Sequence, residues 1–386
     1  MLRISDEQRR IRLGRRHRLA PSVRTDSPVA AADAVVALHA TDAATVFLSA
    51  CARLTEPSVE AVEQALYEDV ALVRLLSMRH TLFAVSAELA PYVDASTARA
   101  IALKERKTLV GHLAEEANGL DEQWLAEAEE AVLAALATRG SATGSQLSTD
   151  VPALKTKITV FPGKKYETAQ GVATRVIRLL ASDGRIRRDR PRGSWTSSQF
   201  RWTASDPWPA LSAAEARAEL ARRWLLSYGP ATEADLKWWT GWTLGDVRKA
   251  LAAVAAEEVQ LDEGTGYVAP GDTAPEPAVE PWAALLPALD PSAMAWAGRG
   301  LHLAADHRAV LFDRTGNIGP TVWWNGEIIG GWAQRPDGEI VWRLLTDPGR
   351  EATAVIAAEA SRLSGWVGEA RITPRFRTPL ERALTA

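Results

Sequence analysis

The chain has a single cysteine, Cys51, among its 386 residues. An intramolecular disulfide and a structural zinc site built on several cysteines are therefore excluded. Cys51 lies in an apolar stretch, 47–54, so we interpret it as a small buried hydrophobic residue rather than a nucleophile. His302, Asp306 and His307 could suggest a metal, but no second pair of ligand residues follows at suitable spacing. We expect no metal and no cofactor.

Long apolar runs are also missing. No run is long enough to span a membrane, and residues 1–7 lack the apolar core of a signal peptide. We therefore expect a cytoplasmic protein that makes no membrane contact. The composition, with 47% hydrophobic and 24% charged residues, is that of an ordinary globular protein. Its length predicts more than one compact unit, because single cores rarely grow beyond roughly 250 residues.

An overall excess of positive charge is absent, since the formal net charge is −3. The charges are nevertheless segregated along the chain. Residues 151–192 carry eleven Lys and Arg against three acids, whereas residues 206–290 carry six basic residues against fourteen acids. Two interpretations stay open: local positive fields that bind a polyanion, or solvated faces whose opposite charges lie adjacent in space.

Helix start signals and apolar runs predict a first unit over residues 1–122. Ser27-Pro28 should begin a helix that continues over 29–38, because serine caps the helix and proline suits its first position. Two more helices and then two short strands should follow, which is the order of elements in a winged helix. Their expected ranges are 43–50, 58–67 and 72–85, with additional helix over 88–113.

The same order of elements recurs twice, although no sequence repeat links the copies. Each copy has three helical patterns followed by a strand pair. The second copy is expected at 123–137, 145–149, 168–180, 185–195 and 200–202, and the third at 213–227, 232–239, 244–255, 259–261 and 266–268. We therefore predict three tandem winged-helix domains, 1–122, 123–205 and 206–272, followed by a proline-rich linker over 271–281.

Beyond the linker the pattern changes to short strands. Asn325-Gly326 is a strong hairpin signal, and Pro336-Asp337-Gly338 is a turn of the same use. Residues 282–386 should therefore form a small antiparallel β-barrel closed by a helix over 351–363, and the fold class is α+β. The expected strands are 294–296, 309–312, 321–324, 327–332 and 339–344.

A short polar cluster, His39-Ala40-Thr41-Asp42, lies between the first two predicted helices. It brings a histidine, a hydroxyl and a carboxylate within four positions. Thr41 or Asp42 also stands where the next helix needs a side-chain acceptor for its free N–H groups. A structural cap and a catalytic site are therefore both open interpretations.

Four phrases, spread over nearly the whole chain, point to a known family. They are Met78-Arg79-His80-Thr81-Leu82, residues 228–235 with Trp238, Trp239 and Gly241, Leu286-Pro287-Ala288-Leu289-Asp290, and residues 374–380. In this order they resemble the winged-helix DNA glycosylases of the AlkZ and YcaQ type. The resemblance implies a C-shaped, positively charged channel for duplex DNA, a groove-probing hairpin from the barrel, and excision of alkylated purines, including bulky adducts.

The polar cluster falls on the motif position of that family and departs from it. Characterised members carry Gln-x-Gln, and relatives carry Gln-x-Asp or His-x-Gln, where this chain has His39-Ala40-Thr41. Because N7-alkylpurines already carry positive charge, the reaction needs a held water and negative charge near the sugar. We expect Asp42 to supply the charge and neutral His39 to position or deprotonate the water. Thr41 would orient the water or cap the next helix.

Basic side chains in several regions are the expected contacts to double-stranded DNA, because phosphate contacts dominate affinity. They are Arg185, Arg187, Arg188, Arg190 and Arg192 on the second hairpin, Lys155, Lys157, Lys164 and Lys165 before it, and Arg79, His307, Arg308 and Arg314 elsewhere. The arginines between Arg9 and Arg18 are either a second contact strip or a solvated helix face.

Two functions from different classes remain. The first is a monomeric, monofunctional DNA N-glycosylase that needs no metal or cofactor. The alternative is a non-catalytic DNA-binding protein, either a transcription factor or a damage sensor. The absence of a dimerisation helix or a ligand domain favours the enzyme. The replaced glutamines favour the binding protein.

Overall fold

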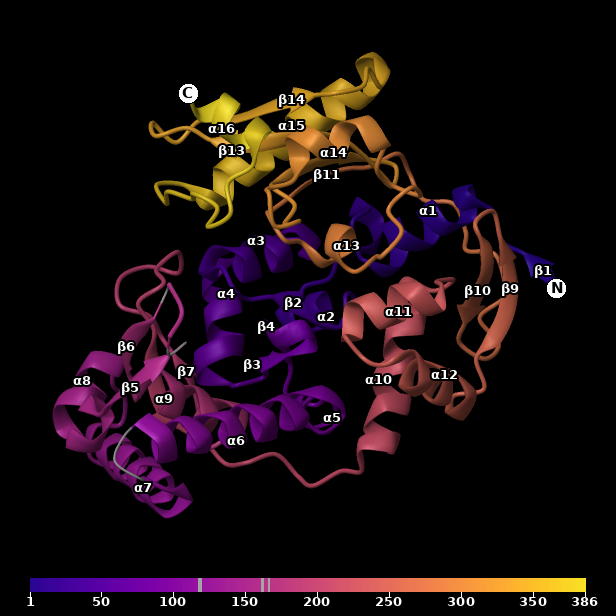
Figure 1. Cartoon of the computed structure of the whole chain (residues 1–386). Helices are drawn as coiled ribbons and strands as arrows, with labels where there is room; N and C mark the ends of the chain where they lie inside the picture. Colours follow the sequence, from indigo (N-terminus) through magenta and orange to yellow (C-terminus); the bar gives the residue numbers. More distant parts are fainter. Residues whose placement is uncertain (117–119, 161–162, 166) are drawn as a thin grey trace.

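The computed structural model describes residues 1–116, 120–160, 163–165 and 167–386 and has a mixed α+β fold. Figure 1 shows the N-terminal part at the centre, the second predicted domain at the lower left, the third at the right, and the C-terminal part above them. Among the described residues no helix is long and apolar enough to cross a membrane. Cys51 is a buried free thiol, as predicted.

The N-terminal part contains the predicted three helices followed by a strand pair. Its helices are α1 (Asp6–Arg16), α2 (Pro28–Asp33), α3 (Ala43–Arg53), α4 (Val59–Glu63), α5 (Ala90–Val93) and α6 (Arg99–Glu116), with short 3₁₀ or π turns at Pro21–Val23, Gln64–Glu68, Met78–His80 and Asp94–Ala98. Its strands are β1 (Leu2–Arg3), β2 (Leu38–His39), β3 (Leu72–Ser77) and β4 (Thr81–Ser86).

The predicted helix over 29–38 is too long. It ends at Asp33, and Leu38 and His39 pair instead with Ala84 and Phe83 of β4. The sheet order is therefore β2-β4-β3. The backbone N–H and C=O groups of β2 form hydrogen bonds with β4, which is distant in the sequence. The residue pattern around 29–38 therefore could not predict this pairing. His39 therefore lies on an edge strand of this sheet.

The second part contains the predicted basic hairpin and one hairpin that the pattern does not predict. Its elements are α7 (Glu122–Arg139), α8 (Gly144–Asp150), a 3₁₀ turn at Pro152–Lys155, β5 (Lys157–Val160), β6 (Thr168–Gly171), α9 (Ala173–Ser182), β7 (Ile186–Asp189) and β8 (Arg201–Ala204). The helix expected over 168–180 starts only at Ala173, because Thr168–Gly171 pairs with β5. Residues 168–171 are exposed, so no apolar face holds them in a helix.

The third part confirms the predicted helices and hairpin. Its elements are α10 (Ala213–Tyr228), α11 (Glu233–Thr240), α12 (Leu244–Ala253), β9 (Glu257–Leu261) and β10 (Gly264–Val268). Thr232 caps α11 in a reciprocal capping box with Asp235. The N-terminal β1 joins this hairpin as a parallel third strand, giving the order β1-β9-β10. The identity of the three helical sets as winged helices stays a prediction.

The C-terminal part forms a four-stranded antiparallel sheet rather than the predicted β-barrel. Its order is β11-β12-β13-β14, with no pairing recorded between the two edge strands in the described chain. The strands are β11 (Ala283–Leu286), β12 (Thr321–Trp324), β13 (Glu327–Gln334) and β14 (Ile340–Leu344), and the helices are α13 (Pro291–Met294), α14 (Arg308–Leu311), α15 (Gly349–Val367) and α16 (Pro379–Thr385), with a 3₁₀ turn at Ala305–His307.

Two strands predicted for the barrel, 294–296 and 309–312, are wrong. The first falls at the end of α13, which Asp290 caps with Pro291 at its first position. The second is α14. Without these strands too few remain to close a barrel, and α15 packs across the sheet instead (Figure 1). The two turns, Asn325-Gly326 and Pro336-Asp337-Gly338, connect β12 to β13 and β13 to β14 as predicted.

The hydrophobic core of the described residues has two large parts. The larger joins buried residues of the N-terminal, third and C-terminal parts, from Leu13 to Leu384, and includes Trp195 of the second part. The smaller runs from Leu109 to Ile186 and lies within α6 and the second part. The boundaries predicted for the four domains remain predictions.

Candidate nucleic-acid site beside the His39–Asp42 turn

His39 is a buried, neutral side chain on β2. Its ring packs edge-to-face on Phe83, with 5.3 Å between ring centroids, and the backbone N–H of Thr41 donates to its Nδ1 at 3.4 Å. Burial, with a contribution from the positive charge of Arg79, lowers the pKa of His39 to about 3. The imidazole is therefore uncharged near neutral pH and is a weak base.

Both carboxylate oxygens of Asp42 are hydrogen-bonded. Oδ1 accepts from the backbone N–H of Ala44 at 3.2 Å, which makes Asp42 the N-cap of α3 as the sequence predicts. Oδ2 accepts from the backbone N–H of Arg375 at 2.9 Å, and the Arg375 guanidinium donates to the carbonyl of Thr41 at 3.4 Å. The C-terminal segment is therefore attached to the turn at two points.

Thr41 differs from its two neighbours. It is partly exposed, and its hydroxyl makes no hydrogen bond with any described residue. Its backbone is held at both ends, because its N–H donates to His39 and its carbonyl accepts from Arg375. The Thr41 hydroxyl is thus a positioned polar group that is available to a water or a ligand.

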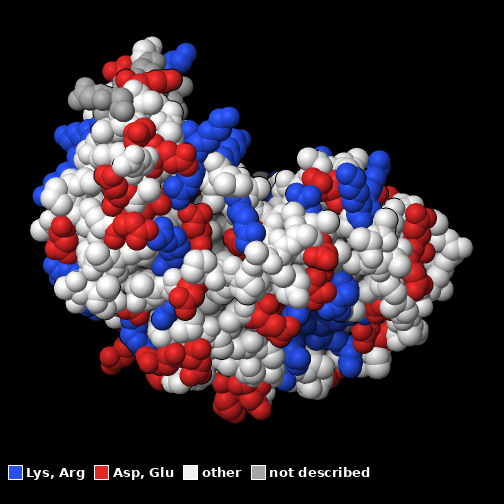
Figure 2. Space-filling model, turned by 90° about the horizontal axis from the view of Figure 1, so that it is seen from below, with Lys and Arg blue, Asp and Glu red and all other residues white. Residues whose placement is uncertain are grey.

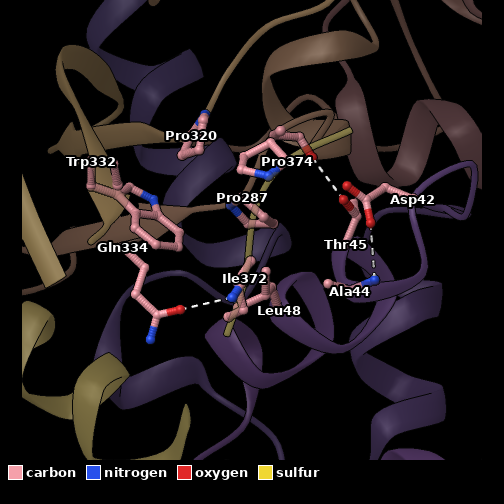
Figure 3. A pocket seen from close by; sticks show the side chains of 12 residues that line it. Asp42, Ala44, Thr45, Leu48, Pro287, Pro320, Trp332, Gln334, Ile372 and Pro374 are labelled. Atoms are coloured by element: carbon pink, nitrogen blue, oxygen red, sulfur yellow. Dashed lines mark hydrogen bonds between the residues drawn. The ribbon is translucent and has the colours of Figure 1, made fainter. Parts of the chain in front are cut away.

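A small apolar cavity lies on the inner side of the turn (Figure 3). Its volume is ≈ 10 Å³, which is room for about one water molecule. Thr45 donates to the carbonyl of Ala288 at 3.1 Å across its edge, and Gln334 accepts from the backbone N–H of Ile372 at 2.8 Å (Figure 3). A purine cannot enter this cavity, so a base would have to approach the turn from its outer side.

A wide basic groove is connected to the turn through Arg375. Its volume is ≈ 1210 Å³, and it lies between the 305–316 region and residues 375–382. We call it the C-terminal groove; its arginines are Arg308, Arg314, Arg375, Arg377 and Arg382. Because Arg375 lines the groove and also contacts Thr41 and Asp42, the groove and the turn are directly connected.

The five arginines predicted for the second hairpin have different environments. Arg185 pairs with Glu130 at 2.5 Å, and Arg190 forms ion pairs with Glu63 and Glu68. Arg187 is partly buried and Arg192 is exposed. Arg188 lies 4.0 Å from the ring centroid of Phe200, and burial, together with the charges of Arg74 and Arg375, lowers its pKa to about 10. Arg185 and Arg190 must give up acidic partners before they can bind phosphate.

The other predicted DNA contacts also differ in how accessible their side chains are. Lys155, Lys157, Lys164 and Lys165 are exposed near the β5–β6 hairpin. Arg308 and Arg314 line the C-terminal groove, and Arg79 stacks on Trp238 at 4.7 Å. His307 is buried, with Nε2 at 3.3 Å from the Thr346 hydroxyl, so it faces the protein rather than the groove.

The arginines of α1 form ion pairs within the protein rather than a solvated face, and their contact with DNA stays a prediction. Arg12 and Arg16 pair with Asp272, and Arg15 and Arg16 pair with Glu276, so α1 holds the acidic linker. Opposite charges that are distant in sequence therefore lie adjacent here. Figure 2 shows Lys and Arg in separate groups with Asp and Glu between them, and groups of Lys and Arg on both sides of a hollow in the outline.

Sequence reasoning missed a buried ionic network at the far end of α3 from the turn. Arg53, at the end of α3, binds both carboxylate oxygens of Asp290 at 2.9 and 3.0 Å, and both residues are fully buried. Arg53 also donates to Ser292 at 2.8 Å, and Ser292 contacts Nδ1 of His17 at 2.8 Å. Asp290 stands directly before Pro291, and this pair is a local signal for a helix N-cap. The ion pair with Arg53 has no local signal, because the two residues are 237 positions apart.

The fold and the site define a mixed α+β protein whose polar turn is joined to an arginine-lined groove. The family model described as DNA glycosylase AlkZ-like matches residues 32–366. Since this match covers most of the chain, the protein belongs to the AlkZ-like DNA glycosylase family.

A solved structure supports the shared fold. The Streptomyces sahachiroi DNA glycosylase AlkZ is similar with a TM-score of 0.70 and 20% sequence identity, over 94% of this chain and 98% of that one. A search of curated proteins found no match. The family resemblance predicted from the four phrases is therefore confirmed at the level of the AlkZ-like family.

Proposed function

We propose that this protein is a monofunctional DNA N-glycosylase that hydrolyses the bond between the sugar and an alkylated or bulky-adducted purine in duplex DNA. One observation carries the proposal. Arg375 connects the His39–Asp42 turn, where the resemblance to the family puts the motif, to the C-terminal groove. A nucleotide whose phosphates lie in that groove would place its sugar near Thr41 and Asp42.

The chemistry divides among the three motif residues. A cationic N7-alkylpurine leaves as the neutral base with the electron pair of the glycosidic bond, and a water oxygen then bonds to C1′ and loses its proton to the surrounding solvent. The negative charge of Asp42 stabilises the positive sugar in the transition state. The Thr41 hydroxyl accepts or donates a hydrogen bond to the water. His39 positions Thr41 through the Thr41 N–H bond, because its lowered pKa makes it a poor proton acceptor.

The decisive experiment measures base release from methylated and bulky-adducted duplex DNA as alkali-labile abasic sites. We expect Thr41→Val, which keeps the shape and removes the hydroxyl, to lower the rate by about 10-fold to 1000-fold without unfolding the protein. Asp42→Asn keeps an acceptor for the α3 cap but removes the charge, and it should also lower the rate. Thr353→Val, at a partly exposed position of α15, is the matched control. Unchanged rates for both site variants would contradict the assignment.

One observation favours a non-catalytic DNA-binding protein as the second candidate. Both oxygens of Asp42 already hold backbone N–H groups, which suits a structural cap without further chemistry. The same assay separates the two functions. DNA that is retarded in a gel but acquires no abasic sites across a broad lesion panel would support binding alone.

A further inference from the structure

A row of alternating arginines and aromatic rings extends away from the turn. The guanidinium carbon of Arg79 lies 4.7 Å from the ring centroid of Trp238, and that of Arg299 lies 5.5 Å from the same ring. Arg299 also lies 5.2 Å from Phe312, and Arg308 lies 4.7 Å from Phe312. We call these five residues the arginine–aromatic ladder. They come from the β3–β4 turn, α11, the segment after α13, and α14 with the residue that follows it.

The cations of the ladder lack acidic partners. None of its three arginines forms an ion pair with a described carboxylate, whereas most arginines of α1 and α10 do. The Nε of Arg79 and one terminal nitrogen of Arg299 are buried with no hydrogen-bond partner in the described structure. Burial and the charges of Arg308 and Arg79 lower the pKa of Arg299 to about 10, and Asp235 opposes this only in part. Such a row is unfavourable unless an anion neutralises it.

The two ends of the ladder lie at the two features of the candidate site. Arg79 is close enough to His39 for its charge to help lower the pKa of that histidine. Arg308 and Phe312 line the C-terminal groove. Arg79 adopts a left-handed backbone conformation, with φ 54°, which is uncommon for a residue with a side chain and often marks functional sites. The ladder therefore leads from the groove to the turn.

We propose that the arginine–aromatic ladder binds successive phosphates of the DNA strand that carries the target nucleotide. This inference rests on the proposed function. A guanidinium stacked on a ring keeps its planar donor fork oriented, and that fork matches a phosphate. The rings themselves are less available for base stacking, because Phe312 is buried between Arg299 and Arg308, and Trp238, although 39% exposed, has Arg79 and Arg299 beside its ring. Phosphate is therefore the ligand that the free donors fit best.

The test is the salt dependence of duplex DNA binding, measured by fluorescence anisotropy. Removing one arginine that binds a phosphate should reduce the slope of log K against log salt by about 0.9. We expect this change for Arg79→Gln, Arg299→Gln and Arg308→Gln, with weaker binding to all sequences alike. Arg222→Gln, an exposed arginine paired with Glu219, is the matched control and should keep the wild-type slope. Arg308 is exposed, so its variant should fold even if a variant of a buried arginine does not.

The outcomes separate the two proposals. Wild-type slopes in the folded ladder variants, with DNA still bound, would overturn the ladder alone. Reduced slopes without base release from any adduct would support the ladder and overturn the glycosylase. A wild-type protein that binds no duplex DNA would overturn both. Arg79→Lys, which keeps the charge but removes the planar fork, should bind more weakly than wild type and more tightly than Arg79→Gln.

Discussion

The polar side chains of His39, Thr41 and Asp42 differ in the hydrogen bonds that they already make within the protein. The ring of His39 is packed and accepts from Thr41, and the carboxylate of Asp42 holds two backbone N–H groups. The hydroxyl of Thr41 has no partner among the described residues. A threonine reaches less far than a glutamine, so a water held here must lie closer to the turn.

The pH dependence of base release tests the role of His39. Its pKa of about 3 means that the ring does not change charge between pH 5 and 8. We therefore expect the rate of base release to be independent of His39 titration across this range. The measurement is a pH–rate profile for the wild type and for His39→Asn. An inflection near pH 6.5 that disappears in the variant would show that His39 acts as a titrating base instead.

Acid should destabilise the protein through its buried histidines, and His302 is the clearest example. Its ring is fully buried against Trp323, neither ring nitrogen has a described partner, and burial lowers its pKa to about 3. The unfolded chain binds this proton first as the pH falls below about 6.5. The free energy of unfolding therefore decreases as the pH falls from 6.5 towards 3.

The matching variant is His302→Phe, which keeps a flat ring beside Trp323 and removes the titrating group. Urea unfolding at several pH values should show a pH slope that is smaller by about 1.4 kcal/mol per pH unit between pH 6 and 4. His80→Gln, at an exposed position, is the control. If both variants keep the wild-type slope, another group causes the acid sensitivity.

At the level of residues, local sequence signals predicted that Asp42 caps α3, but they did not predict which distant residues contact it. Asp42 stands before an apolar helix, and that pattern alone indicates an N-cap. The contact with Arg375 joins residues 333 positions apart, and no local pattern contains it. The same holds for the histidine, because the strand pairing of His39 with Phe83 replaces the helix that the flanking residues favour.

Among the elements, α3 is the one around which the site is built. All of its residues are buried, Asp42 caps its start, and Arg53 at its end is bound to Asp290. Breaking a buried ion pair leaves a charge without a partner, which costs about 3–5 kcal/mol. The two ends of α3 thus fix the turn and the C-terminal part relative to each other.

A double-mutant cycle tests this pair. Arg53→Met and Asp290→Ala should each lower the free energy of unfolding by about 3–5 kcal/mol, because each leaves the other charge buried. The double variant should be destabilised by much less than the sum, since neither charge remains. Chemical denaturation provides the free energies. Additive effects would mean that the two residues act independently.

Predicted elements were correct where a short stretch carries the whole signal. Asn325-Gly326 specifies a hairpin, and Ser27-Pro28 specifies a helix start, and both occur as predicted. The β-barrel was wrong because sheet closure depends on pairing between distant strands. Residues 294–296 and 309–312 are apolar enough for strands, but both lie in short helices or at their ends. A short apolar run alone does not distinguish a buried strand from a buried helix.

At the scale of the whole molecule, the two hydrophobic cores predict two unfolding steps. The smaller core, within α6 and the second part, contains fewer buried side chains than the larger one. Trp195, although it comes from the second part, belongs to the larger core, where its ring lies 5.3 Å from Phe47. Since stability increases with buried apolar area, the smaller core should unfold first.

Hydrogen exchange read by mass spectrometry at increasing denaturant would measure this order. Peptides from α7 and α9 should lose protection at lower denaturant than peptides from α3. Trp195→Ala removes a ring from the larger core, so it should lower the second transition and narrow the gap between the two. Trp202→Ala instead removes a ring that packs on the smaller core and should lower only the first transition. A single shared transition in the wild type and in both variants would mean that the chain unfolds as one cooperative unit.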